Sequence, residues 1–217
     1  MRLLILGASG RCGQWAVRLA HRRGHSLRVV VRPGTDFEAP SGVEVMRGSV
    51  LEPMTVLKAV EGQDAVVSCL GPKRKNPRNP WSKLDSPDDI AARSARYITA
   101  AMANHNVSRG AAISAAGVGD SRHRLSPVLR WFLDHSSIGL AYRDLDRMEQ
   151  QYTASGLDWL VVRPVTLVDG PPTSKVRVVD RYRLLSRVSR GDVSQWLLDG
   201  VESEGPFFDS RVMIGWR

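Results

Sequence analysis

The sequence predicts an α/β fold in which a doubly wound parallel sheet is flanked by helices on both faces. Two observations carry this prediction. The apolar run 3–6 enters a glycine-rich turn and then a helix within the first two dozen residues. Short β-branched runs then alternate with segments of helical periodicity. Such alternation is typical of parallel sheets whose strands are buried on both faces.

Length and composition favour a single globular domain over residues 1–217. A chain of 217 residues buries roughly 70% of the surface that its unfolded form exposes. Apolar residues make up 42% and charged residues 24%, as in ordinary globular proteins. No apolar run approaches the ~18 residues of a membrane span, and a count of 2 cysteines is too low for a disulfide framework. We expect a cytoplasmic protein without a membrane association.

The net charge of +9 has three interpretations: binding to nucleic acid, solubility, and attraction of anionic small molecules. The arginines are spread along the whole chain, and neither zinc-ligand spacing nor an aromatic RNA-binding signature accompanies them. Nucleic acid is therefore the weakest of the three. We expect a small-molecule substrate, and the sequence leaves the oligomeric state open.

The turn after the first strand has the pattern G-x-x-G-x-x-G, formed by Gly7, Gly10 and Gly13. The first glycine permits a positive φ, the second lets the backbone approach a pyrophosphate, and the third lets the helix pack closely. Phosphates would then meet the N–H groups that open the helix. Because the pattern follows a strand and opens a helix, it predicts dinucleotide binding rather than an ordinary turn.

The other elements follow in chain order. Further strands are predicted at 27–31, 43–46, 65–70, 111–114 and 157–162, with an edge strand at 175–179. Helices are predicted at 14–23, 53–60, 87–104, from 127, at 143–152 and at 190–198. Ser86, Ser126 and Ser189 are the expected N-caps of three of these helices. The apolar stripe 128–133 is expected to be core, or in part the wall of a pocket for a flat ligand.

The second strand ends at Arg32, where an NAD-binding site usually carries an acidic residue. A guanidinium suits bidentate contact with a 2′-phosphate, which a carboxylate would repel. Arg32 therefore predicts NADP(H) rather than NAD(H), against the alternative of a solvated arginine. A basic loop leaves the same end of the sheet, with Lys73, Arg74, Lys75, Arg78 and Lys83. This loop is either solvated surface or a lid over cofactor phosphate or an anionic substrate.

The chain resembles the atypical short-chain dehydrogenase/reductases, most of all the NAD(P)H-binding proteins of the biliverdin reductase B (flavin reductase) type. The matching segments are 6–13, 31–32, 62–67, 70–71, 114–115, 155–158, 162–164 and 189–193. The resemblance implies a Rossmann fold that binds NADPH. It also implies hydride transfer to a flat conjugated acceptor such as a flavin, a linear tetrapyrrole or a quinone.

The resemblance also assigns cofactor-binding residues by position. It gives the pyrophosphate to Gly7, Ser9, Gly10, Arg11, Cys12 and Gly13, and the 2′-phosphate to Arg32. It places Leu70, Gly71 and Pro72 at the adenosine ribose, Ser114 and Ala115 at the nicotinamide, and Pro164 at the exit of the sixth strand. Ser49 and Val50 stand at the adenine position, although the family often has Asp in place of Ser49. The following Val165 stands where the family sometimes has His. We expect the substrate side to come from 115–145 and 164–190.

The better-known dehydrogenases of this superfamily use a Ser, a Tyr and a Lys four residues after the Tyr. Ser114 and Tyr142 are spaced for the first two, but Asp146 takes the place of the Lys and would raise the pKa of Tyr142. Ser114 is the predicted hydrogen-bonding residue near the reacting centre. Tyr142 is the candidate proton donor, and packing on the core is the stronger interpretation of it. No metal site is predicted.

Two other functions remain open on the sequence. One is a redox sensor that binds NADP(H) without turnover and signals through a protein partner. The other is a pathway-specific ketoreductase or epimerase. The missing lysine suits the sensor as well as it suits the reductase.

Overall fold

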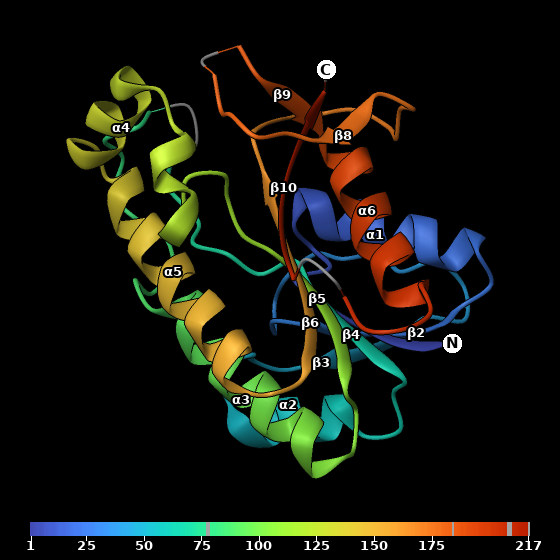
Figure 1. Cartoon of the computed structure of the whole chain (residues 1–217). Coiled ribbons are helices and arrows are strands. Elements are labelled where there is room, and N and C mark those ends of the chain that lie inside the picture. Colours follow the sequence, from blue (N-terminus) through green and yellow to red (C-terminus); the bar gives the residue numbers. More distant parts are fainter. Residues whose placement is uncertain (77–78, 184, 208–209, 217) are drawn as a thin grey trace.

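The computed structural model describes residues 1–76, 79–183, 185–207 and 210–216 (Figure 1). The main sheet contains β1 (Arg2–Leu6), β2 (Ser26–Val31), β3 (Glu44–Arg47), β4 (Ala65–Ser68), β5 (Arg109–Ile113), β6 (Asp158–Pro164), β8 (Val176–Val178) and β10 (Arg211–Trp216). A small second sheet contains β7 (Thr166–Val168) and β9 (Arg187–Ser189). The helices are α1 (Arg11–Arg22), α2 (Pro53–Val60), α3 (Ile90–Asn104), α4 (Pro127–Asp134), α5 (Ile138–Ala154) and α6 (Arg190–Glu202). A 3₁₀ helix spans Gly119–Arg124.

The eight strands of the main sheet lie in the order β3-β2-β1-β4-β5-β6-β10-β8. Every neighbouring pair from β3 to β10 is parallel, and β8 joins the edge antiparallel to β10. The order reverses between β1 and β4, which is the switch point of a doubly wound sheet. The predicted fold class is confirmed.

Helices cover both faces of this sheet. α1 and α6 lie on one face, and α2, α3 and α5 lie on the other (Figure 1). Along β1, Leu3 and Ile5 pack into the first layer, whereas Leu4 and Leu6 pack into the second. All four side chains are fully buried. A strand covered on both faces has no solvent side, so its sequence is a continuous apolar run.

The start of α3 is a correction to the sequence analysis. The helix begins at Ile90, later than the Ser86-Pro87 pair predicts, and the Ser86 hydroxyl instead accepts a bond from the Lys73 backbone N–H at 3.0 Å. The N-terminal N–H groups of Ala91 and Ala92 donate to the buried Asp144 carboxylate of α5, at 2.8 and 3.0 Å. The cap therefore comes from another helix and leaves no local sequence pattern.

The other predicted N-caps are confirmed. Ser126 accepts a bond from the Leu129 N–H, and Ser189 accepts one from the Asp192 N–H. The helix that begins after Ser126 does not form core as expected: Val128 is 68% exposed, Trp131 is 61% exposed, and Leu133 is its buried residue.

Three strands and part of a helix were missed by the sequence analysis. β10 inserts between β6 and β8, and β7 pairs with β9 beside the main sheet. α5 begins at Ile138 rather than near residue 143. The helices in the described part of the chain include none that is long and apolar enough to cross a membrane.

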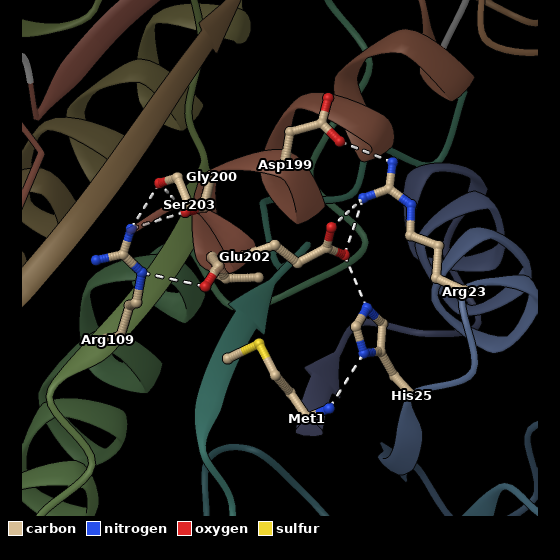
Figure 2. Close-up of polar contacts among 9 residues, drawn as sticks. Met1, Arg23, His25, Arg109, Asp199, Gly200, Glu202 and Ser203 are labelled. Atoms are coloured by element: carbon tan, nitrogen blue, oxygen red, sulfur yellow. Dashed lines mark hydrogen bonds and ion pairs between the residues drawn. The ribbon is translucent and has the colours of Figure 1, made fainter. Parts of the chain in front are cut away.

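The C-terminal end of α6 is held at the edge of the sheet where the parallel strands begin (Figure 2). Arg23 contacts Glu202 at 2.8 Å and Asp199 at 2.7 Å. His25 contacts the same Glu202 at 2.7 Å, and Arg109 donates to the Gly200 carbonyl at 2.9 Å (Figure 2). These contacts tie α6 to the segments that precede β2 and open β5. The opposite edge, where the parallel strands end, holds the predicted site residues.

Candidate functional site

The glycine turn between β1 and α1 requires glycine for steric reasons. Gly7 has a φ of 76°, and the Gly10 N–H donates to its carbonyl at 2.9 Å. A Cβ on Gly13 would lie 2.0 Å from that same carbonyl oxygen. No side chain caps α1, so none competes for the N–H groups of its first turn. A closely packed helix with an open N-terminus fits a phosphate ligand.

A cavity of about 210 Å³ opens beside this turn, at the ends of β1, β2 and β4. Its lining comprises Gly7, Ser9, Gly10, Val30, Arg32, Gly48, Val50, Cys69, Leu70, Gly71, Lys73, Asp85, Ser86 and Ile90. Seven of the predicted cofactor residues are among them: Gly7, Ser9, Gly10, Arg32, Val50, Leu70 and Gly71. The structure thus gathers at one cavity residues that are far apart in the sequence. Glycines, a helix N-terminus and an arginine fit the phosphates of a dinucleotide.

Three other predicted pyrophosphate residues form the first turn of α1. Gly13 is buried against the Gly7 backbone, as described above. The Arg11 side chain forms an exposed ion pair with Asp169 at 3.2 Å, which links the glycine turn to the loop after β7. Burial raises the pKa of the Cys12 thiol to about 11. A thiol with a raised pKa is mostly protonated at neutral pH, which makes it a poor nucleophile.

The remaining predicted cofactor residues lie outside the lining of this cavity. Ser49 closes a turn through its hydroxyl, which accepts a bond from the Leu51 N–H at 3.2 Å. Pro72 leads from β4 into the basic loop, and Ala115 follows Ser114 after β5. The Pro164 carbonyl at the end of β6 accepts a bond from the Ala116 N–H at 2.9 Å. Asp85, which the sequence analysis did not single out, also lines the cavity and forms an ion pair with Lys73 at 3.1 Å.

The two described ends of the basic loop after β4 pair with each other. The Lys75 N–H donates to the Lys83 carbonyl at 3.0 Å, and Trp81 packs edge-to-face on Phe132 of α4 at 5.8 Å between ring centroids. All three described lysines of the loop are exposed, and Lys73 also lines the cavity beside the glycine turn, where it pairs with Asp85. The two alternatives for the loop therefore both stay open, and Arg78 lies outside the described residues.

Ser114 belongs to a buried polar network that the sequence analysis did not find. Its hydroxyl donates to Glu149 of α5, and Glu149 also forms an ion pair with Arg163 of β6. Arg163 makes a second ion pair with Asp120 at 2.6 Å. Partial burial raises the pKa of Asp120. The contact with Arg163 lowers that pKa, and the net result lies below the ordinary value of an aspartate. The Ser114 proton is therefore directed at a carboxylate inside the protein.

Tyr142 lies on the same helix as Glu149, and its hydroxyl donates to the Ala116 carbonyl at 3.1 Å. Burial, with a smaller effect from Tyr182, raises the pKa of Tyr142 above its ordinary value. The predicted cause was wrong: Asp146 is not among the groups that raise this pKa, and its carboxylate accepts a bond from Gln150 at 3.0 Å.

Tyr142→Phe tests whether this hydroxyl donates a proton in a reaction. We expect NADPH oxidation to stay within about threefold of the wild-type rate, because an effective general acid contributes about 100-fold or more. The free energy of unfolding should fall by about 1 kcal/mol, since one buried hydrogen bond is lost. Steady-state rates and urea titrations measure the two effects. A rate loss of about 100-fold would make Tyr142 the proton donor.

A second, larger cavity of about 590 Å³ lies between residues 123–127 and 180–183. The Tyr182 N–H donates to the Arg124 carbonyl at 3.1 Å, and the Tyr182 hydroxyl bonds to Thr166 at 2.8 Å. Both lining segments belong to the regions predicted for the substrate side. Arg124, Arg181 and Arg183 line the cavity, so it is suited to anionic groups.

Several solved structures have the same fold. The anaerobilin reductase ChuY from Escherichia coli O157:H7 is 21% identical, with a TM-score of 0.77 over 99% of this chain and 96% of that one. A short-chain dehydrogenase/reductase from Veillonella parvula DSM 2008, solved in complex with NADP, is 18% identical, with a TM-score of 0.77 over 99% and 94%. SP1627 from Streptococcus pneumoniae TIGR4, which carries the assignment NADH-flavin reductase, is 18% identical, with a TM-score of 0.73 over the full length of both.

These likenesses show the fold, and the family follows from the sequence. The model of the NAD(P)H-binding family matches residues 7–204, from the first glycine of the turn to just past the end of α6. The match includes every residue that lines the cofactor cavity. The predicted resemblance is confirmed, and the chain belongs to the NAD(P)H-binding family.

Proposed function

We propose that this protein is an NADPH-dependent reductase that transfers hydride to a flat conjugated acceptor, such as a flavin, a linear tetrapyrrole or a quinone. One observation carries the proposal. The two hydroxyls at the predicted reacting centre donate to groups inside the protein: Ser114 to Glu149, and Tyr142 to the Ala116 carbonyl. Asp146 stands where a ketone reductase of this superfamily would have a lysine.

This arrangement discriminates between classes of acceptor. Reduction of an isolated ketone leaves an alkoxide, which needs a positioned acid. A conjugated acceptor spreads the arriving charge and takes its proton from solvent. When bound, the nicotinamide supplies the hydride, and the protein contributes binding and orientation. The assignments of ChuY as an anaerobilin reductase and of SP1627 as an NADH-flavin reductase agree with such an acceptor.

The preference for NADPH rests on Arg32. This residue follows the end of β2, is exposed, and lines the cofactor cavity. There its guanidinium would meet the 2′-phosphate in two parallel hydrogen bonds. Lys73 is on the same lining but pairs with Asp85 at 3.1 Å, so Arg32 is the guanidinium that the proposal assigns to the 2′-phosphate.

Arg32→Asp is expected to weaken NADPH binding by about 10- to 100-fold, the range for charge-assisted hydrogen bonds, and to change NADH binding far less. Isothermal titration with both nucleotides measures the difference. Arg18→Asp is the matched control, because Arg18 is exposed on α1 and does not line the cofactor cavity. Equal losses for NADPH and NADH would contradict the assignment of Arg32.

The arginines that line the larger cavity favour the binding of acceptors that carry carboxylate or phosphate groups. Arg124, Arg181 and Arg183 gather there, and Asp180 is the acidic residue of the lining. A cavity with excess positive charge attracts anions and speeds their encounter, an effect that salt weakens. Among conjugated acceptors, the protein should therefore favour FMN and biliverdin over uncharged quinones.

Turnover tests the proposal. Purified protein should oxidise NADPH in the presence of FMN, biliverdin or menadione, seen as loss of the reduced-nicotinamide absorbance, and should not do so with simple ketones. Reduction of ketones at comparable rates would contradict it. Tight NADPH binding without turnover on the whole panel would favour the redox sensor, which senses the cofactor and passes no hydride.

A further inference from the structure

Most of the net charge of the chain is gathered at one end of the molecule. Three segments meet there: the basic loop 73–85, the stretch 122–137 that contains α4, and the stretch 180–187 that leads into β9. We call their described residues the basic end (73–76, 79–85, 122–137, 180–183 and 185–187). These residues include 10 lysines and arginines against 3 aspartates, so they supply +7 of the net charge of +9.

Contacts between the three segments join them into one surface. The Trp81 indole N–H donates to the His135 carbonyl at 3.0 Å, which ties the basic loop to the end of α4. Leu125 forms a β-bridge with Tyr182, which ties the stretch before β9 to the start of α4. In Figure 1, α4 and β9 lie at the same end of the molecule. The arginines are spread along the sequence, but the fold concentrates the excess of positive charge.

Large apolar side chains are exposed on the same surface. Trp81 and Trp131 are each 61% exposed, and Leu185 is 79% exposed. The exposed Val128 stands three residues before Trp131 on α4, so both side chains lie on one face of that helix. Tryptophan and aliphatic side chains among lysines and arginines are typical of surfaces that bind at the headgroup level of a lipid bilayer.

The charges of the basic end indicate an anionic partner. Two of its three aspartates pair with cations of the same surface. Lys75, Lys83 and Arg130 form no ion pair with any residue that the structure describes. A second copy of the chain would bring like charges together, because a two-fold contact uses the same surface on both subunits. Nucleic acid would match the charge but would leave the aliphatic Val128 and Leu185 without a role.

We propose that the basic end docks on the surface of a membrane that contains anionic lipids. Its lysines and arginines would meet the lipid phosphates, and Trp81, Val128 and Trp131 would enter the headgroup region. The sequence analysis expected no membrane association because the chain has no apolar run of membrane-spanning length. Binding at the surface of a bilayer needs no span. The inference is independent of the proposed function.

Sedimentation with vesicles tests the role of the charges. The wild-type chain should bind vesicles of phosphatidylcholine and phosphatidylglycerol in equal parts, should bind phosphatidylcholine alone far less, and should be released by salt. Lys83→Gln/Arg130→Gln should lower the affinity for the anionic vesicles by about 25-fold, which is about fivefold for each cation. Neither residue lines the cofactor cavity or the larger cavity.

Arg18→Gln/Arg22→Gln is the matched control, because it removes the same charge from exposed arginines of α1. This helix covers the face of the sheet opposite to α5 (Figure 1). The control should keep the wild-type affinity within about twofold, since salt largely screens charges that are farther than about 10 Å from the lipid.

Brominated lipids test which face meets the bilayer, because bromine quenches the fluorescence of tryptophans that reach the lipid. They should quench part of the wild-type fluorescence, and Trp81→Phe/Trp131→Phe should lose this quenching. Trp159 is 3% exposed and should not be quenched in either chain. Trp131→Phe alone should lose part of the quenching if the double variant does not fold.

Four results would overturn the inference. Two concern affinity: no binding to the anionic vesicles, or an equal loss in the Lys83/Arg130 and Arg18/Arg22 variants. The third is quenching that persists in the tryptophan variants, because another face would then meet the lipid. The fourth is binding to polyuridylic acid without binding to vesicles, which would make nucleic acid the partner. NADPH turnover tests the proposed function separately, so the two proposals can fail independently.

Discussion

Gly13→Val is expected to abolish measurable NADP(H) binding and to lower the stability of the fold. A Cβ at this position would lie 2.0 Å from the Gly7 carbonyl oxygen and 2.8 Å from the Ala8 Cα. Both are backbone atoms of the turn, so no side chain can move aside. Overpacking typically costs about 1–3 kcal/mol, and we expect the upper end of that range. Calorimetric titration and urea unfolding measure the two losses.

Gly24→Ala separates lost binding from lost stability. Gly24 has a φ of 77° and ends α1 far from the glycine turn, and an added Cβ would meet nothing within 4 Å. The substitution should cost about 1–2 kcal/mol through backbone strain alone and should leave NADP(H) affinity unchanged. If Gly13→Val bound NADP(H) as tightly as this control, the glycine turn would not be the phosphate site.

Arg163→Met is expected to lower the free energy of unfolding by about 3–5 kcal/mol, the usual cost of leaving a buried charge unpaired. Methionine has a similar apolar stem, so little of the loss should come from packing. The buried Glu149 carboxylate would lose the guanidinium and keep the Ser114 hydroxyl as its hydrogen-bond donor. Urea unfolding, followed by far-UV circular dichroism, measures the change.

The double variant Arg163→Met/Glu149→Leu checks the physical reason for that loss. Once both charges are removed, no buried ion remains uncompensated, and most of the stability should return. A further control is Asp120→Ala, which removes the exposed partner of Arg163 and should cost no more than about 1 kcal/mol. A double variant no more stable than Arg163→Met would show that the loss is one of packing.

Features encoded in consecutive residues could be predicted. The first strand, the glycine turn and α1 lie within one short segment, and the helix starts after Ser126 and Ser189 depend on a side chain three residues from the N–H it caps. The order of helices and strands could be predicted because the apolar residues of a helix and of a strand recur with different periods. For the cofactor site, the rule that ligands bind beyond the strand ends was enough to bring Gly7, Arg32 and Gly71 together.

Features that depend on distant residues could not be predicted. Asp144 caps α3 from another helix, and Glu149 reaches Ser114 from α5. Neither contact leaves a local signature, because burial decides which carboxylate meets which donor. β10 was missed for a similar reason, since its place between β6 and β8 is set by pairing across the sheet. The exposure of Trp131 likewise depends on how α4 packs.

The binding of NADP(H) over the glycine turn is the claim on which the proposed function depends. A crystal structure of the protein with NADPH tests it most directly. The diphosphate should lie against the backbone N–H groups that open α1, with the 2′-phosphate at Arg32. A diphosphate bound elsewhere, with these N–H groups facing solvent, would contradict the cofactor site and every assignment built on it.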